Sequence, residues 1–427
     1  MKDNSIYILD TNILLFDARA LWNFPGQKLL VPIEVIGDLD NFKHGTDETA
    51  RNARFAALAF DELRKKGSLK EGVELENGSV IKVASPVQPG VRSDAALLIL
   101  AEQLRKKREK PILVTKSVNL RVKADALGLE AQDYGQDTPV DTDTMRGWVR
   151  IATNEKTLAA LREGEAVPAK RFKLHSNQYA FLHEKDNPSK GICARFHANE
   201  GVLRKLSEAN RSACGIKSLN IEQTFSLDAL MDPAITLVTL AGRAGTGKTL
   251  LAIAAALQQI FGQKRYEKLL VFRPTMPVSR DLGYLPGDIN DKMRPWMQPV
   301  YDALELIRSM DRRGGRLLPN DVLNCPEISV EPLTYIRGRS IPNQFIIIDE
   351  AQNLTPLEVK TAITRVGLGS KVVLTGDPAQ IDNPYVDARS NGLTRLVGRF
   401  LESPLAAHVT LVHGERSELA ETASTLL

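Results

Sequence analysis

The chain has few cysteines and no long apolar run. Three cysteines occur in 427 residues and none has C-x-x-C spacing, so the sequence predicts buried free thiols rather than a disulfide framework or a zinc site. The longest apolar runs, such as residues 250–257, fall short of the ~18 to 20 residues that cross a bilayer. Acidic and polar residues interrupt the first ten residues, unlike a secretory signal. We therefore expect a cytoplasmic protein without a membrane partner.

A strong charge of either sign is also missing. The formal net charge is +4 and charged residues make up 25%, which is too mild to indicate a polyanionic partner by itself. Hydrophobic residues make up 43%, as in ordinary globular proteins. A chain of 427 residues exceeds what one core usually holds. We predict three parts, residues 1–135, 136–216 and 217–427.

The clearest chemical signal is a phosphate-binding loop. Residues 235–240 form an apolar, β-branched run typical of a buried strand, and residues 250–258 have the Ala and Leu content of a helix. Between them, G-x-x-x-x-G-K-T lets backbone N–H groups converge on phosphate oxygens at a helix N-terminus. Lys248 would contact the β- and γ-phosphates, and Thr249 would ligate Mg²⁺. The predicted nucleotide-binding residues are Gly242, Arg243, Ala244, Gly245, Thr246, Gly247, Lys248 and Thr249.

Polar residues follow two later apolar strands. The strand at 345–348 leads to Asp349, which would hold the Mg²⁺ shell, and to Glu350, which would orient and deprotonate the attacking water. After the strand at 372–374, Gln380 is placed to sense the γ-phosphate. Gln223 lies ahead of the first strand, where a side-chain amide can read the adenine edge. Together with the phosphate loop, these motifs predict an ATPase.

Hydrolysis of ATP also needs an arginine to stabilise the charge that develops on the transferred phosphoryl group. Four arginines are candidates, and the sequence does not rank them. Arg365 lies between two of the predicted strands, where a neighbour in a ring could use it. The other candidates are Arg337, Arg339 and Arg416.

Acids stand at strand ends and helix starts in the first part of the chain. Asp10 follows an apolar strand at 5–9, Asp38 lies in a helix after a second strand, and Asp94 opens a helix at 95–107 as an N-cap pair with Ser93. Acids that converge on one sheet edge can hold two divalent ions, Mg²⁺ or Mn²⁺, for phosphodiester cleavage. The alternative is that each acid merely caps a helix or ends a strand.

The order of these motifs resembles a PIN-type nuclease domain across roughly the first 130 residues. The resemblance assigns metal binding to Asp10, Asp38 and Asp94, with Asp38-Leu39 in place of the usual Glu-Leu and Glu34 one turn earlier as a substitute. The family's fourth acid is replaced by Ser117. A hydroxyl holds a divalent cation more weakly than a carboxylate. The sequence therefore leaves RNA cleavage open.

The middle part shows a weaker pattern. Residues 178–183 and 191–197 read as strands separated by a turn-rich stretch, which predicts a hairpin in a small β-rich module. Basic and aromatic residues in this part could bind single-stranded nucleic acid, or they could be a solvated face over a small aromatic core. They are Lys170, Arg171, Phe172, Lys173, Tyr179, Lys190, Arg195, Phe196, Arg204 and Lys205.

The C-terminal part resembles the PhoH-type ATPases, relatives of superfamily 1 helicases. The resemblance rests on L-G-Y-L-P-G-D at 282–288, K-M-R-P at 292–295, P-V-Y-D at 299–302 and Y-I-R-G-R at 335–339. Arg416 resembles the last helicase motif. The whole chain resembles the PIN–PhoH fusion proteins of bacteria and archaea, which implies an α/β chain with a PIN-like α/β/α domain, a small β-rich module and a RecA-like P-loop domain.

This resemblance implies unwinding of RNA driven by ATP and Mg²⁺, coupled to RNA cleavage, with single-stranded RNA as partner and a hexameric ring as the assembly. Two other readings stay open at this point. Ser117 favours a nucleotide-switched RNA-binding or scaffold protein that does not cut. A signalling ATPase that acts on protein partners is the second.

Overall fold

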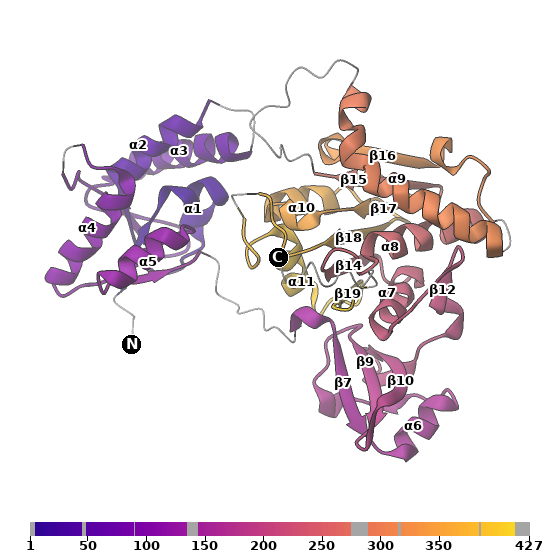
Figure 1. Ribbon diagram of the computed structural model, residues 1–427. Helices are drawn as coiled ribbons and strands as arrows, with labels where there is room; N and C mark the ends of the chain where they lie inside the picture. The colour runs from indigo at the N-terminus through magenta and orange to yellow at the C-terminus, as the bar shows by residue number, and fades with distance from the viewer. Residues whose placement is uncertain are drawn as a thin grey trace. The chain divides into compact units, whose positions relative to one another are not determined.

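The computed structural model describes residues 5–44, 48–88, 90–134, 144–274, 289–314, 317–383 and 386–414. The chain divides into two compact units, Met1–Pro139 and Val140–Leu427 (Figure 1). The motif at 282–288 and Arg416 lie outside the described residues. Among the residues described, no helix has the length and apolar character needed to span a membrane. The three cysteines are free and buried, as predicted.

The first unit is built on a six-stranded sheet of order β3-β4-β2-β1-β5-β6. All pairs are parallel except the antiparallel β3–β4 pair. Because β1 lies between β2 and β5, the residues that follow β1 stand near the middle of the carboxyl edge. The strands are β1 (Ser5–Leu9), β2 (Lys28–Pro32), β3 (Val73–Glu74), β4 (Val80–Ala84), β5 (Lys110–Val114) and β6 (Glu130–Gln132).

The helices of this unit cover the sheet and share its buried core. They are α1 (Thr11–Phe16), α2 (Ile33–Phe42), α3 (Glu48–Lys66), α4 (Ser93–Lys106) and α5 (Val118–Ala126), with a 3₁₀ turn at Ala20–Trp22. One predicted boundary is wrong: Arg92, with an extended backbone, is the N-cap of α4, and Ser93 and Asp94 already belong to its first turn. An acid in the first turn favours a helix through the macrodipole without capping it, which explains the shift.

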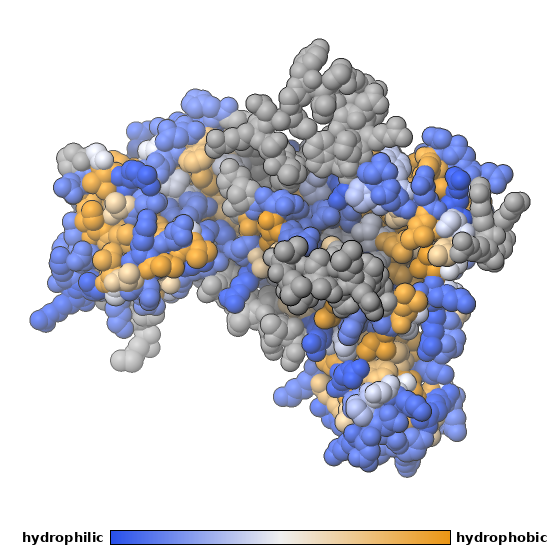
Figure 2. Space-filling view, in the orientation of Figure 1, coloured by the Kyte–Doolittle hydropathy of each residue, from blue (hydrophilic) through white to orange (hydrophobic). Residues whose placement is uncertain are grey.

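The second unit begins with the small β-rich module. Its five-stranded sheet has the order β7-β9-β10-β11-β8, and β9 and β10 form the predicted antiparallel hairpin. The surface around α6 (Glu155–Arg162) is largely hydrophilic (Figure 2). The strands are β7 (Trp148–Thr153), β8 (Val167–Pro168), β9 (Tyr179–Glu184), β10 (Asn187–His197) and β11 (Val202–Lys205), followed by the short pair β12 (Ser212–Ala213) and β13 (Ile216–Lys217).

This module is fixed to helix α7 (Ile221–Met231) by buried charge. Arg195 on β10 contacts Asp228 at 3.1 Å and Asp232 at 2.5 Å, and the hydroxyl of Tyr179 donates to Asp228 at 3.1 Å. The Arg195 side chain is 12% exposed. Tyr179 and Phe196 are also buried. These three residues therefore serve the packing of the module, and of the two readings left open by the sequence, burial favours the aromatic core for them.

The P-loop part is a fully parallel six-stranded sheet of order β16-β15-β17-β18-β14-β19. The strands are β14 (Leu237–Gly242), β15 (Lys268–Arg273), β16 (Ile328–Pro332), β17 (Gln344–Ile348), β18 (Lys371–Gly376) and β19 (Ala406–Leu411). The helices are α7, α8 (Lys248–Leu257), α9 (Ile289–Gly314), α10 (Pro356–Ile363) and α11 (Gly392–Phe400). Turns of 3₁₀ or π type lie at Thr144–Arg146, Lys170–Phe172, Glu208–Arg211, Gln258–Gly262, Val322–Asn324, Leu333–Ile336 and Ala351–Asn353.

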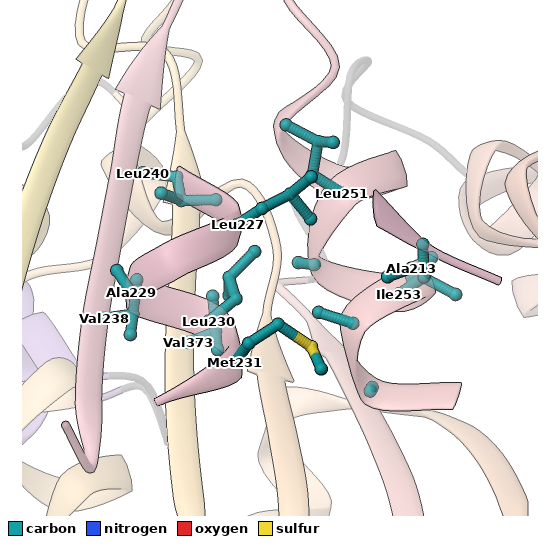
Figure 3. Close-up of a cluster of buried hydrophobic side chains, with 14 of the residues drawn as sticks. Ala213, Leu227, Ala229, Leu230, Met231, Val238, Leu240, Leu251, Ile253 and Val373 are labelled. Carbon is teal, nitrogen blue, oxygen red and sulfur yellow. The ribbon is translucent and has the colours of Figure 1, made fainter. Parts of the chain in front are cut away.

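Two apolar clusters bury both faces of this sheet. On one face, side chains of α7 and α8 such as Leu230 and Leu251 pack near Val238 and Leu240 of β14 (Figure 3). On the other face, alternate strand residues such as Ile348 contact the α10 and α11 side. Burial on both faces requires strands that are apolar at every position, which explains the continuous runs in the sequence. It also leaves the strand ends as the place for polar chemistry.

Candidate active sites

The phosphate loop joins the end of β14 to the start of α8. Gly242 has φ 149°, and a Cβ atom there would lie 2.2 Å from the carbonyl oxygen of Leu411. Gly247, at the N-cap of α8, has φ 91°. Both positions therefore require glycine. The loop ends at the helix N-terminus, where unpaired N–H groups and the dipole favour an anion.

Lys248 is folded over this loop. Its Nζ donates to the carbonyl oxygens of Gly242 at 2.5 Å and of Arg243 at 2.9 Å, and its side chain is largely buried. The hydroxyl of Thr246 also donates to the Arg243 carbonyl, at 2.9 Å. The loop is thus held in shape by its own side chains, and Lys248 lies where it can exchange these carbonyls for phosphate oxygens.

Gln223 is buried against the same loop. Its Nε2 donates to the carbonyl of Thr246 at 3.2 Å, and its Oε1 accepts from the backbone N–H of Leu219 at 2.9 Å. The amide therefore positions the phosphate loop in this structure. Its predicted contact with adenine stays a prediction.

Two hydroxyl groups from distant parts of the sequence meet at one carboxylate oxygen of Asp349. The hydroxyl of Thr249 donates to Asp349 Oδ1 at 2.9 Å, and that of Thr375 donates to the same oxygen at 2.6 Å. Hydroxyl and carboxylate oxygens are the ligands and outer-sphere partners that Mg²⁺ prefers. The arrangement at the P-loop helix therefore fits Mg²⁺ bound with a nucleotide.

Glu350 follows directly and is held in an uncommon conformation. Its backbone has φ 55° and ψ 37°, a left-handed geometry that is sparsely populated by residues other than glycine. A terminal nitrogen of Arg273 lies 3.0 Å from Glu350 Oε1, and Arg273 Nε lies 3.2 Å from Asp349 Oδ2. The two acids at the end of β17 are therefore compensated by one arginine at the end of β15.

Gln352 connects Glu350 to the loop after β18. Its Nε2 donates to Glu350 Oε2 at 2.7 Å and to the carbonyl of Gln380 at 2.9 Å, while its Oε1 accepts from the N–H of Asp377 at 3.1 Å. A Cβ at Gly376 would lie 2.6 Å from that Oε1. The side chain of Gln380 itself is exposed. Gln380 is therefore coupled to Glu350 through its backbone.

The predicted arginines differ in position. Arg365 is exposed at the end of α10, and its carbonyl accepts from the N–H of Ile341, shortly before β17 begins. That is the amino edge of the sheet, opposite the phosphate loop. Arg365 is therefore not brought to the site of its own chain, and a role in a neighbour's site stays a prediction.

In the first unit, Asp10 is almost fully buried. Its Oδ2 accepts hydrogen bonds from the hydroxyl of Thr115 at 2.6 Å and from the amide of Asn12 at 2.7 Å. Burial raises the pKa of Asp10 to about 6, and the nearby Asp94 carboxylate adds to the rise, against the lowering by the Thr115 hydrogen bond. A bound cation would stabilise the ionised form of this buried carboxylate. The Asp10 side of the site therefore fits a divalent ion.

The other acids are near Asp10 but not assembled around it. The hydroxyl of Thr11 donates to Asp38 Oδ2 at 3.2 Å, and Arg92 lies 3.6 Å from Asp94 Oδ2. Glu34 accepts from the N–H of Val87 at 3.3 Å. Within the described ranges, no group of three or more His, Cys, Asp or Glu is arranged to hold a metal ion. The predicted three-acid set is thus incomplete in this conformation, because Asp38 and Asp94 stand on separate helices.

Ser117 has a structural task. Its Oγ accepts from the N–H of Leu120 at 3.2 Å and caps α5, and its own N–H donates to Thr115 Oγ1 at 3.0 Å. Thr115 is the residue that donates to Asp10. Ser117 is therefore linked to Asp10 through Thr115. It stands at the position where the PIN resemblance implies a carboxylate.

Comparison with known proteins agrees with this two-part architecture. Residues 215–425 match the family model for PhoH-like protein, and residues 7–135 match that for PIN domain. Protein PhoH2 of Bacillus subtilis (strain 168) is 41% identical over 99% of this chain and 100% of its own length. The chain belongs to the PhoH2 family. Two further relatives named Protein PhoH2, from Thermobispora bispora and Mycolicibacterium smegmatis, are each 35% identical over 99% of this chain and 96% of their own lengths.

Membership of the PhoH2 family confirms the predicted PIN–PhoH fusion and the α/β fold class. The chain joins a PIN-type nuclease domain to a P-loop nucleotide-binding ATPase domain, and both families are hydrolases. Domains of these two kinds generally depend on nucleotide and on divalent metal.

Several residues of both sites were not predicted from the sequence of this PhoH2 family member. The sequence analysis assigns no role to Arg273, although an arginine at the end of a buried strand beside the Asp349 strand is a usable signal. It assigns no role to Gln352 either. Thr115 and Asn12 were given no role, because that role appears only when β1 and β5 pair and bring them to Asp10.

Proposed function

We propose that this protein is an ATP-dependent RNA helicase that feeds single-stranded RNA to its own PIN-type endoribonuclease domain. ATP and Mg²⁺ act in the motor, and Mg²⁺ or Mn²⁺ acts in the PIN domain. The assembly we propose is a homo-oligomeric, hexameric ring. The observation that carries the proposal is the Glu350–Gln352–Gln380 connection, which joins the water-activating acid to the loop after the next strand.

In the motor, each step uses a group that already stands at the carboxyl edge. Lys248 leaves the loop carbonyls and pairs with the β- and γ-phosphates, while loop N–H groups hold the phosphate oxygens. Thr249 and Asp349 would hold Mg²⁺, which would neutralise charge on the phosphates. Glu350 orients the attacking water and accepts its proton.

Loss of the γ-phosphate can then be transmitted. Gln352 uses its amide nitrogen for Glu350 and Gln380 and its amide oxygen for Asp377. A shift of Glu350 between water-bound and water-free states therefore changes the hydrogen bonds of the loop at 376–382. This supports coupling of hydrolysis to movement along RNA, because the three partners of Gln352 cannot relax independently.

The RNA surface we propose lies on the small β-rich module. After removal of the buried residues from the predicted set, exposed cations remain on β10, on β11 and in the turn that follows β8. Cations of this kind bind phosphates without reading sequence. They are Lys170, Arg171, Lys173, Lys190, Arg204 and Lys205.

In the PIN domain, the proposed cleavage needs the acids around Asp10. A divalent ion at Asp10, Asp38 and Asp94 would supply an activated water at the phosphodiester. Thr115 and Asn12 orient the Asp10 carboxylate through Oδ2. The other oxygen of Asp10 is then the natural ligand atom.

A second function has one specific observation in its favour. Ser117 caps α5 where the family pattern has an acid, and the three remaining acids are not assembled. A protein that binds RNA under nucleotide control without cutting it would not need an assembled set of metal-binding acids. Single-stranded RNA would then still raise ATP turnover, but no cleavage would follow.

The experiment is a paired assay of ATP turnover and RNA cleavage on the full chain. Turnover is measured without nucleic acid, with single-stranded RNA and with single-stranded DNA, and cleavage is followed in Mg²⁺ and in Mn²⁺. Lys248→Ala serves as the inactive control. We expect RNA to raise turnover. If neither RNA nor DNA changes the rate of ATP turnover while the folded protein still binds nucleotide, the helicase proposal is wrong. Light scattering with and without nucleotide tests the ring, and a monomer under both conditions contradicts it.

A further inference from the structure

Two acids at the end of β17 share a single arginine. Arg273 reaches Asp349 Oδ2 with Nε at 3.2 Å and Glu350 Oε1 with a terminal nitrogen at 3.0 Å. The side chains of Arg273 and Asp349 are 12% and 6% exposed, so water screens this contact less than it screens a surface pair, whereas the Glu350 side chain is 42% exposed. A guanidinium cannot give up its charge. One fixed cation therefore compensates both acids that the mechanism assigns to Mg²⁺ and to water.

We propose that Arg273 is the arginine that acts on ATP within the same chain. With no nucleotide bound, it holds Asp349 and Glu350. With ATP bound, it turns to the γ-phosphate and stabilises the charge that develops there during hydrolysis. The proposal rests on the ATPase half of the proposed function and requires neither RNA nor a ring neighbour.

The reason for the turn is a change in charge balance at the carboxyl edge. The triphosphate brings several negative charges to the loop in front of Lys248. Once Thr249 and Asp349 hold a divalent cation, Asp349 no longer depends on Arg273 for compensation. The planar fork of Arg273 is suited to pair with two phosphate oxygens. The guanidinium is therefore drawn from the carboxylates to the phosphates.

This movement also frees the base. Arg273 engages Oε1 of Glu350, whereas Gln352 engages Oε2 at 2.7 Å. When Arg273 leaves, Gln352 still fixes the carboxylate, and Oε1 can accept a proton from water. The water oxygen then bonds to the γ-phosphorus, the bond from that phosphorus to the β–γ bridging oxygen breaks, and the proton goes to Glu350. ADP and phosphate are the products.

Two of the arginines that the sequence offers as candidates are less suited. Arg339 donates to Glu331 at 2.7 Å and lies over the Phe272 ring, at the end of the neighbouring strand. Arg365 stands at the opposite edge. In the described part of the chain, Arg273 is the arginine that contacts both Asp349 and Glu350.

The test uses Arg273→Ala, Arg273→Lys and, as a matched control, Arg399→Ala, which removes an exposed arginine from the last turn of α11. For Arg273→Ala we expect kcat for ATP to fall by about 10² or more with KM changed by less than about threefold. Arg273→Lys keeps the charge but not the fork, so it should recover only part of kcat. Arg399→Ala should match the parent.

A second readout does not depend on turnover. ADP with aluminium fluoride imitates the transferred phosphoryl group, and Arg273→Ala should lose most of its affinity for this complex while it binds a non-hydrolysable ATP analogue as the parent does. A variant that hydrolyses ATP at or above the parental rate would overturn the proposal, since Arg273 would then only restrain Glu350. Equal loss of both ligands would overturn it as well, because the role would be structural. RNA stimulation is measured on the same samples, so a parent that hydrolyses ATP but ignores RNA contradicts the helicase proposal and leaves the Arg273 result standing.

Discussion

The two candidate sites place acids at the carboxyl edge of a parallel sheet in opposite electrostatic settings. In the motor, Asp349 has two hydroxyl donors and an arginine around it. In the PIN domain, Asp10 has a hydroxyl and an amide but its charged neighbour is another carboxylate, Asp94, and burial raises its pKa to about 6. The motor acids are thus compensated before any ligand arrives, whereas the PIN acid needs a cation to become so.

The difference teaches what each site would gain from a cation. In the motor, hydroxyl donors and Arg273 already surround the acids, so a divalent ion would replace existing partners. In the PIN domain, burial and the Asp94 carboxylate raise the pKa of Asp10, so a divalent ion there would offset both effects.

The largest expected effect breaks the motor half of the comparison. Lys248→Ala removes the cation from the phosphate loop, and Glu350→Gln removes the proton acceptor, so each should lower ATP turnover by about 10³ or more, which corresponds to ~4 kcal/mol. The two variants should differ in binding: Glu350→Gln should hold nucleotide, and Lys248→Ala should not. Steady-state turnover and fluorescent-nucleotide titration measure the two properties. Parental turnover in Glu350→Gln would show that another group is the base.

The next effect concerns the cost of the buried charge at Asp10. An ordinary Asp has a pKa of 3.8, and that of Asp10 is raised to about 6. Below pH ~4 both the folded and the unfolded states carry the proton, so there is no cost. Between pH ~4 and ~6 the unfolded state releases the proton first, so stability falls as pH rises. Above pH ~6 the full cost, about 3 kcal/mol, is present.

Asp10→Asn should remove this cost. Without divalent ions at pH 7, the variant should raise the opening free energy of the first unit by up to about 3 kcal/mol, and at pH 4 it should match the parent. Hydrogen exchange of the β1 and β5 amides in the full chain measures this. With Mn²⁺ present, the parent should have the higher opening free energy of the two, since only the parent binds the ion. Asp94→Asn is the control: it should lower the pKa of Asp10 only in part, because burial is the larger cause.

Local patterns predicted the framework of both sites well. The strand at 5–9 has the predicted bounds, and the one at 345–348 begins one residue earlier, at Gln344. The run at 345–348 was predictable because a strand buried on both faces needs apolar residues at every position. The phosphate loop was equally clear, since its glycines have backbone angles that other residues avoid. Strands and loops of this kind can be predicted because they depend on consecutive residues.

Contacts between distant residues were harder to predict. Arg273 is 77 positions from Glu350, and no spacing rule connects them. Tyr179 and Arg195 looked like surface residues because a hairpin does not reveal that it will pack on α7. Ser117 was identified as the departure from the family pattern, but its cap on α5 was not predicted. Tertiary pairing decides such cases.

The smallest effect we predict sharpens the comparison at Ser117. Aspartate and asparagine both cap helices about as well as serine, so Ser117→Asp and Ser117→Asn should both preserve the bond to the Leu120 N–H and leave stability within about 0.5 kcal/mol of the parent. Only the aspartate adds a carboxylate next to Thr115, which already contacts Asp10. The pair therefore separates charge from capping.

We expect Ser117→Asp to bind Mn²⁺ about tenfold more tightly than Ser117→Asn, a difference of ~1.4 kcal/mol, because an added carboxylate gives the ion a further ligand. RNA cleavage should rise with metal affinity, since two-metal chemistry needs both ions present together. ATP turnover should not change, as its site lies in the other unit. Titration calorimetry and cleavage time courses at matched metal concentration measure both effects. If the parent and Ser117→Asn already cut RNA as fast as Ser117→Asp, then Asp10, Asp38 and Asp94 suffice, and the missing acid does not limit this domain.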